Sequence, residues 1–196
     1  IIRLTMDIRA GKALEKFSGN EVRIVDRDEL FQDGFLAWAD QILVGKNNTR
    51  RVINANLRQT LLEIDDMEPV VGDRVICLHN EWECVNDTND ALVNGLSGTI
   101  TELDWTNENP FMRKTPIITF QPDFEGAGAF PGLEVDYKIF TENEATVNRL
   151  TFKNIPKWYH PKQFDYGYAI TCHKAQGSEY DKVIVLEEFL RGESKE

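Results

Sequence analysis

The sequence predicts an α/β protein whose parallel sheet is interrupted by an inserted small β domain. Residues 41–45 and 182–186 are continuous apolar runs, typical of parallel strands that are buried on both faces. Between them, prolines and glycines separate short β-rich runs that lack a helical pattern. Residues 68–148 hold 4 Lys+Arg against 15 Asp+Glu, which gives a formal net charge of −11. The flanks are balanced: the net charge is −1 over residues 1–67 (10 against 11) and +1 over residues 149–196 (8 against 7). An inserted domain would produce this shift in composition.

The first flank alternates helix and strand patterns. Apolar spacing predicts a helix over residues 2–17, interrupted near Gly11, a strand over 22–25 and a second helix over 28–40. A helix with a basic face is expected over 46–58, after the first parallel strand. Its cations could meet phosphate, although ordinary surface arginines fit the spacing equally well. They are Lys46, Arg50, Arg51 and Arg58.

The acidic middle has the pattern of a small β domain. Asn94 and Gly95 mark a turn between its first two expected strands. Short strands separated by turns suggest a barrel or a sandwich. From the charge alone, the alternative to an inserted domain is an acidic surface on a single domain. We expect its aromatics, Trp82, Trp105 and Phe111, to pack in the core or rim rather than to stack on bases. The expected strands are residues 74–78, 98–103, 115–120 and 134–140.

After Pro161 the α/β pattern returns. Residues 166–171 are expected to form a strand, residues 172–176 to start a helix, and residues 182–186 to form the next strand. The segment between these strands carries the most specific motif, YAITCHKAQGSE over residues 168–179. This window resembles motif V of superfamily 1 DNA helicases of the RecD type, which include the exodeoxyribonuclease V alpha subunit and related phage helicases.

Two further segments resemble the same family, in the family's order. The sequence LVGKNNTRRVINANLR over residues 43–58 is similar to the motif IV region, with Lys46 where the family has threonine. GDRVI at 72–76 and VNGLSGTI at 93–100 are similar to the SH3-like β-barrel that these helicases insert between motifs IV and V.

The resemblance implies a division of the chain into two domains. Residues 1–67 and 159–196 would form a second RecA-like domain of the P-loop NTPase type, incomplete at its C-terminus. Residues 68–158 would form the inserted SH3-like β-barrel.

The same resemblance implies which residues touch single-stranded DNA. Thr171 and His173 would contact the strand, and a hydroxyl and an imidazole suit phosphate or sugar. Asn47, Arg50 and Asn54 would line the same DNA path.

For ATP, the resemblance implies that Gln176, Gly177 and Glu179 face the nucleotide. Glycine permits close backbone approach, and a carboxylate can accept a hydrogen bond from a ribose hydroxyl. The chain has no G-x-x-x-x-G-K-S/T phosphate loop, whose hydroxyl would hold Mg²⁺. The implied full-length protein uses ATP and Mg²⁺, with its Walker motifs in a preceding domain and its motif VI arginine beyond Glu196. We expect the present chain, as a piece of that protein, to neither bind these cofactors tightly nor hydrolyse ATP nor unwind DNA.

The implied function is that of an ATP-dependent helicase that translocates on single-stranded DNA, 5′ to 3′, in DNA replication, recombination or repair. The alternative is a non-catalytic protein-interaction or DNA-binding module on a degenerate helicase scaffold. Its acidic insert would repel phosphate and would suit a replication or recombination protein as partner. A hydrolase with His173 as general base is a third hypothesis, without an accompanying nucleophile in the motif.

Cysteine usage bears on compartment and metal. Three cysteines form no disulfide framework, which favours a reducing cytoplasm, that of a bacterium or phage-infected cell by resemblance. The spacing of Cys77, Cys84 and Cys172 does not match a structural zinc site, so we expect no metal. No run of about 18 apolar residues exists, and we expect no membrane partner.

Overall fold

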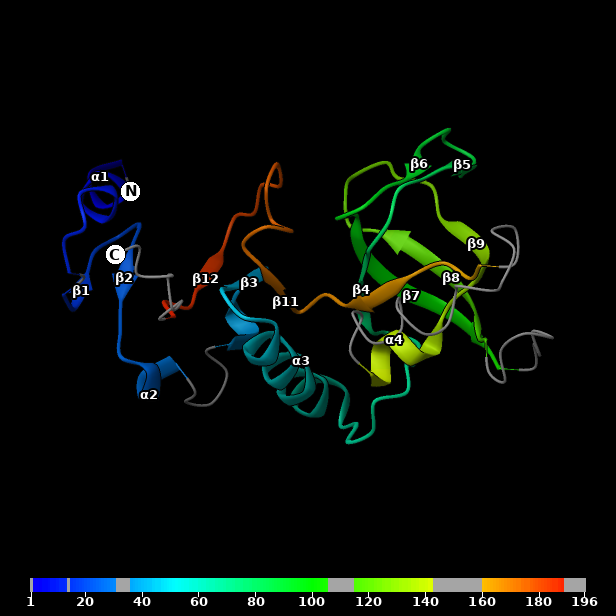
Figure 1. The fold of residues 1–196 in the computed structure, drawn as a ribbon, viewed down its shortest axis with the longest axis horizontal. Helices are drawn as coiled ribbons and strands as arrows, with labels where there is room; N and C mark the ends of the chain where they lie inside the picture. Colours follow the sequence, from blue (N-terminus) through cyan, green and yellow to red (C-terminus); the bar gives the residue numbers. More distant parts are fainter. Residues whose placement is uncertain (1, 14, 31–35, 106–114, 143–159, 189–196) are drawn as a thin grey trace, which may run out of the picture.

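A computed structural model describes residues 2–13, 15–30, 36–105, 115–142 and 160–188 (Figure 1). The N-terminal elements lie at one end of the molecule, a parallel sheet lies in the middle, and the insert lies at the other end. No helix among these residues is long and apolar enough to cross a membrane.

The N-terminal elements are short. Helix α1 (Ile2–Arg9) ends well before residue 17, because the chain turns at Gly11, whose φ of 72° is left-handed. Of the helix expected over 28–40, the first residues are α-helical and residues 36–38 form a 3₁₀ helix, while residues 31–35 lie outside the described part of the chain. The remaining elements are β1 (Phe17–Ser18), its antiparallel partner β2 (Arg23–Ile24), α2 (Arg27–Leu30) and the 3₁₀ helix η1 (Leu36–Trp38).

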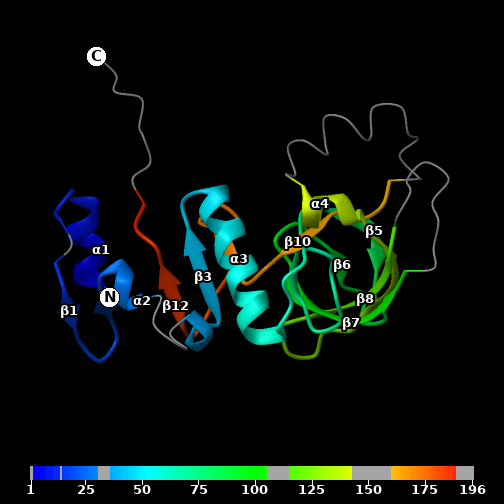
Figure 2. The same cartoon turned by 90° about the horizontal axis from the view of Figure 1, so that it is seen from below.

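The middle of the molecule is the predicted parallel sheet. Strands β3 (Gln41–Val44), β11 (Ala169–Thr171) and β12 (Val183–Val185) pair in the order β11-β3-β12, all parallel. Helix α3 (Asn47–Leu62) runs from β3 towards the insert (Figure 2). Its apolar side packs on the sheet in a buried cluster. The cluster consists of Ile42, Val44, Ile53, Leu57, Ala169 and Ile184.

The insert is built on an antiparallel five-stranded sheet in the order β10-β4-β7-β8-β9. Alternate residues along β7 and β8 face its core, where Ile100, Ile118 and Phe120 are buried. The strands are β4 (Arg74–Cys77), β7 (Ser97–Asp104), β8 (Ile117–Pro122), β9 (Phe130–Glu134) and β10 (Phe164–Tyr166), with β5 (Glu81–Val85) and β6 (Ala91–Leu92) forming a separate hairpin.

The strand predicted over 134–140 is wrong, because β9 ends at Glu134 and helix α4 (Tyr137–Thr141) follows. The Asp136 carboxylate caps this helix by accepting a hydrogen bond from the Lys138 amide. Burial of the consecutive residues Ile139 and Phe140 follows from the helical turn and would not occur along a half-exposed strand.

The predicted closed barrel is not present among the described strands. The two edge strands, β9 and β10, approach each other only through an isolated parallel bridge between Val135 and Lys162. The five-stranded sheet is therefore curved but open.

The chain leaves the insert later than residue 159. Strand β10 still pairs with β4, and β11 joins the parallel sheet three residues after β10 ends, so the switch lies at Gly167 and Tyr168. Glycine suits this close approach because an added Cβ would lie 3.0 Å from the Val75 carbonyl carbon, a tight contact.

The three aromatic residues singled out from the sequence differ in position. Trp105 packs edge-on against Tyr137, with ring centroids 6.0 Å apart, as expected for a packing role. Trp82 on β5 is 67% exposed, so core packing is wrong for this residue. Phe111 lies outside the described residues.

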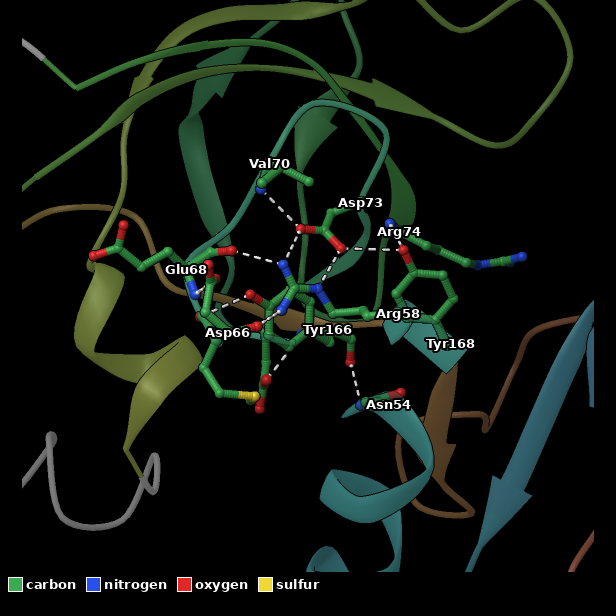
Figure 3. Close-up of polar contacts among 11 residues, drawn as sticks. Asn54, Arg58, Asp66, Glu68, Val70, Asp73, Arg74, Tyr166 and Tyr168 are labelled. Carbon is green, nitrogen blue, oxygen red and sulfur yellow. Dashed lines mark hydrogen bonds and ion pairs between the residues drawn. The ribbon is translucent and has the colours of Figure 1, made fainter. Parts of the chain in front are cut away.

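A buried ion pair joins the insert to α3 (Figure 3). Both side chains are almost fully buried, and Arg58 reaches Asp73 through two hydrogen bonds, 2.7 Å from Nε and 3.0 Å from Nη2. Nη1 and Nη2 also donate to the carbonyls of Asp66 and Glu68, at 2.5 and 2.6 Å. Arg58 therefore holds the whole segment between α3 and β4.

Two tyrosines extend this cluster to the return strand. The Arg58 guanidinium lies 4.2 Å from the centroid of the Tyr166 ring, and the Tyr166 hydroxyl donates to the Met67 carbonyl. The Tyr168 hydroxyl donates to Asp73 at 3.1 Å. The same ion pair thus fixes both connections between the insert and the parallel sheet.

We expect Arg58→Met to lower the free energy of unfolding by about 3 to 5 kcal/mol, because it leaves the Asp73 carboxylate buried without its cation. Urea denaturation followed by circular dichroism measures this loss. The matched control is Arg74→Met, which breaks the partly exposed pair with Asp123 and should cost less than about 1 kcal/mol. Equal losses in the two variants would contradict this account.

Candidate functional site

The three parallel strands bring the predicted site residues to one edge of the sheet. Because β3, β11 and β12 are parallel, their carboxyl ends lie at the same edge. The turn after Val44, the loop after Thr171 and the segment after Val185 therefore meet there. In open α/β sheets this edge is where ligands bind.

The loop after β11 is a series of turns, so the helix predicted to start at 172–176 is wrong. The Thr171 carbonyl accepts hydrogen bonds from the amides of Lys174 (2.9 Å) and Ala175 (3.2 Å), and the Cys172 amide donates to Val44. Gly177 then takes a φ of 87°, which ends any right-handed helical path. This geometry exposes the loop at the sheet edge.

The DNA-contacting residues implied for this loop are accessible. Thr171 is half-buried at the end of β11, and His173 is exposed two residues later. Asn47, the first residue of α3, is also exposed, at the carboxyl end of the adjacent strand β3. The structure thus brings Thr171, His173 and Asn47 to the same edge.

Arg50 and Asn54 do not line that edge. The Asn54 side chain is 2% exposed, donates to the carbonyls of Tyr166 and Ala169, and accepts from the Ala169 amide at 2.6 Å. Arg50 is 7% exposed and pairs with Asp165 at 2.6 Å. These bonds hold β10 and β11 against α3, and the DNA contacts implied for both residues stay predictions.

The residues implied to face ATP lie further along the loop. Gln176, Gly177 and Glu179 are all exposed. Glu179 borders an open hollow whose lining also contains Asp181. Two carboxylates at one hollow repel phosphate but suit the hydroxyls of a ribose. The other lining residues are Leu43, Ala175, Ser178, Tyr180 and Val183.

Glu188 joins the site although the sequence reasoning missed it. Its carboxylate accepts hydrogen bonds from the amides of Gly45 (2.6 Å) and Lys46 (2.8 Å) and from the Thr49 hydroxyl. Burial alone would raise the pKa of the Glu188 carboxyl, but the bonds from Thr49, Lys46 and Gly45 outweigh it and lower the pKa. The available signal was the pair of acidic residues, Glu187 and Glu188, that follows a predicted parallel strand.

One comparison with known proteins matches the part of the chain that contains the loop after β11. Residues 166–194 match the family model of the UvrD-like helicase C-terminal domain, a stretch that begins at the last residue of β10 and contains β11, the loop and β12. This match supports a relationship to superfamily 1 helicases over those residues. A search of curated proteins gives no match.

Two solved structures are similar to the chain. One is a Pif1 helicase from Candida albicans, 14% identical, with a TM-score of 0.41, covering 74% of this chain and 38% of that one. The other is an unliganded Pif1 from Bacteroides sp., 20% identical, with a TM-score of 0.37, covering 74% of this chain and 45% of that one. The chain therefore spans less than half the length of these proteins.

The lowered pKa of Glu188 makes a prediction about pH. A carboxyl whose pKa is lower in the folded state stabilises the fold above its unfolded pKa, and this stabilisation is lost as pH falls through the folded value. At pH 7 we expect Glu188→Gln to lower the free energy of unfolding by about 1 kcal/mol, since it removes a negative charge beside the start of α3.

The difference between wild type and Glu188→Gln should vanish at acidic pH, and urea denaturation at several pH values measures it. Glu187→Gln changes an exposed neighbour and serves as the control. A difference that is constant with pH would contradict the assigned role.

Proposed function

We propose that this chain is the C-terminal part of a superfamily 1 helicase of the RecD type. In the full-length protein it would couple ATP hydrolysis to 5′ to 3′ movement along single-stranded DNA, in DNA replication, recombination or repair. One observation carries the proposal: the helicase family match covers the loop that the fold exposes at the carboxyl edge of its parallel sheet.

The proposed DNA contacts are those of Thr171, His173 and Asn47. A hydroxyl, an imidazole and an amide can each donate a hydrogen bond to a phosphate or sugar oxygen, and such backbone contacts carry no sequence information. Because these three residues lie at one edge of the sheet, a single strand of DNA could pass across the ends of β11 and β3. Binding of this kind is independent of sequence, as a translocating protein requires.

The proposed nucleotide contacts are those of Gln176, Gly177 and Glu179. In the full-length protein, ATP would supply the free energy for movement, and Mg²⁺ would neutralise its phosphates. The carboxylates beside this part of the loop favour the ribose end of the nucleotide. The phosphates would then lie on the Walker motifs of a preceding domain, since the present sequence has none.

A second candidate function is supported by the charge of the insert. The net charge of −11 over residues 68–148 repels phosphate and would suit a basic protein partner, such as a replication or recombination protein. On that hypothesis the chain is a protein-interaction module, and its motif loop does not bind DNA.

We expect the chain to bind a fluorescein-labelled oligothymidylate, with an affinity that falls as salt rises. His173→Ala should weaken binding by about tenfold, because a hydrogen bond to a charged group contributes about 1.5 kcal/mol. Fluorescence anisotropy measures both effects, and His79→Ala, an exposed histidine outside the loop, is the matched control. Absence of binding, or equal affinities of the two variants, would favour the protein-interaction module.

We also expect no ATP turnover from this chain alone, with or without oligothymidylate, because it lacks the phosphate loop that positions ATP and Mg²⁺. A phosphate-release assay tests this. Turnover stimulated by DNA and lost in Glu179→Ala would show that the chain contains a complete ATP site. That result would overturn the proposal that the phosphate-binding motifs lie in a preceding domain.

A further inference from the structure

The insert meets the motif loop in two ways: Ala175 packs against a buried cluster that contains Ile76, Leu78 and Ile139, and one polar turn of the insert lies beside the loop. This turn, residues 93–96 between β6 and β7, faces the loop that follows β11 (Figure 1). The Lys174 ammonium donates a hydrogen bond to the Asn94 side-chain oxygen at 3.2 Å. At Gly95, an added Cβ would lie 3.6 Å from the Lys174 carbonyl oxygen, so the two backbones are also close.

The turn is held firmly by the core of the insert. The Gly95 amide donates to the Cys77 carbonyl, and the Cys77 amide donates to the Leu96 carbonyl, both at 2.9 Å. The Asn94 amide donates to the Asn80 side chain at 2.9 Å. Because Cys77 is buried at the end of β4, these bonds fix the turn to that strand of the insert.

Lys174 is less firmly held by its own loop. Its amide bonds the Thr171 carbonyl, but its four-carbon side chain reaches out of the loop to the insert. An ammonium has three N–H donors, and the bond to Asn94 uses one of them. The other two remain available to an anion at the sheet edge, beside Thr171 and His173.

The chemical type of the acceptor is informative. The insert carries 15 acidic residues against 4 basic ones, yet the residue that meets Lys174 is a neutral asparagine. An aspartate would pair with the ammonium and cancel its charge, whereas an amide oxygen orients it and leaves the full charge in place. The contact therefore fixes a cation without neutralising it.

We propose that Lys174 contacts a phosphate of single-stranded DNA and that Asn94 of the insert is its positioning residue. The inference rests on the proposed function for the identity of the anion. On this proposal the acidic insert supports DNA binding although its net charge repels phosphate, because one uncharged turn orients a cation on the DNA-contacting loop.

The positioning role is tested without DNA. Hydrogen–deuterium exchange of the 196-residue chain reports the order of residues 171–177. Asn94→Ala should raise exchange in this loop, and Asn94→Asp should leave it near wild type because the acceptor is retained. Asn56→Ala, an exposed asparagine in the second half of α3, is the control and should change nothing in the loop. Unchanged loop exchange in Asn94→Ala would overturn the proposal.

The phosphate contact is tested by oligothymidylate binding at several salt concentrations. Lys174→Ala should reduce affinity and lower the slope of log affinity against log salt by about one. Asn94→Asp should reduce affinity by a similar factor although its loop stays ordered, because its carboxylate neutralises Lys174. In the Lys174→Ala background, Asn94→Ala should have no further effect on affinity.

The outcomes separate the two proposals. If the wild type binds oligothymidylate and Lys174→Ala binds equally well with the same salt slope, the Lys174 contact is wrong while the proposed function stands. If the wild type does not bind, the proposed function fails and the DNA contact fails with it. A rise in loop exchange in Asn94→Ala would then support only the link between insert and loop.

Discussion

The buried pair between Arg58 and Asp73 is the constraint on which the rest of the structure depends. Two charges removed from water are tolerated only when every donor and acceptor has a partner, and here the partners come from α3, the segment before β4 and the return strand. The pair therefore fixes both points at which the chain enters and leaves the insert.

This constraint reaches the functional edge through short connections. Tyr168 bonds Asp73 and directly precedes β11, whose last residue is Thr171. On the insert side, Asp73 directly precedes β4, whose end at Cys77 holds the turn that touches Lys174. The Arg58–Asp73 pair thus lies between the two elements that meet again at the motif loop. The buried pair of Arg50 and Asp165 and the apolar cluster of Ile76, Leu78, Ile139 and Ile170 also hold the insert against the parallel sheet.

The sequence predicted the elements that continuous apolar runs define, and missed those decided by distant contacts. β3, β12 and α3 appear where expected because their apolar pattern is local. Glu188 was missed because its partners lie 139 to 143 residues away in the sequence, and the pairing of β12 with β3 brings them together. For Asn54, the resemblance to motif IV implied a DNA contact, but a sequence motif does not show that the side chain is buried in the fold.

The most direct test of the account is an NMR titration of the isotope-labelled chain with oligothymidylate. The account predicts chemical-shift changes concentrated at the carboxyl edge, in residues 45–49 and 171–177, and extending to the turn at 93–96 of the insert. Shift changes confined to other surfaces, such as the hairpin of β5 and β6, would contradict a DNA-binding role for this edge.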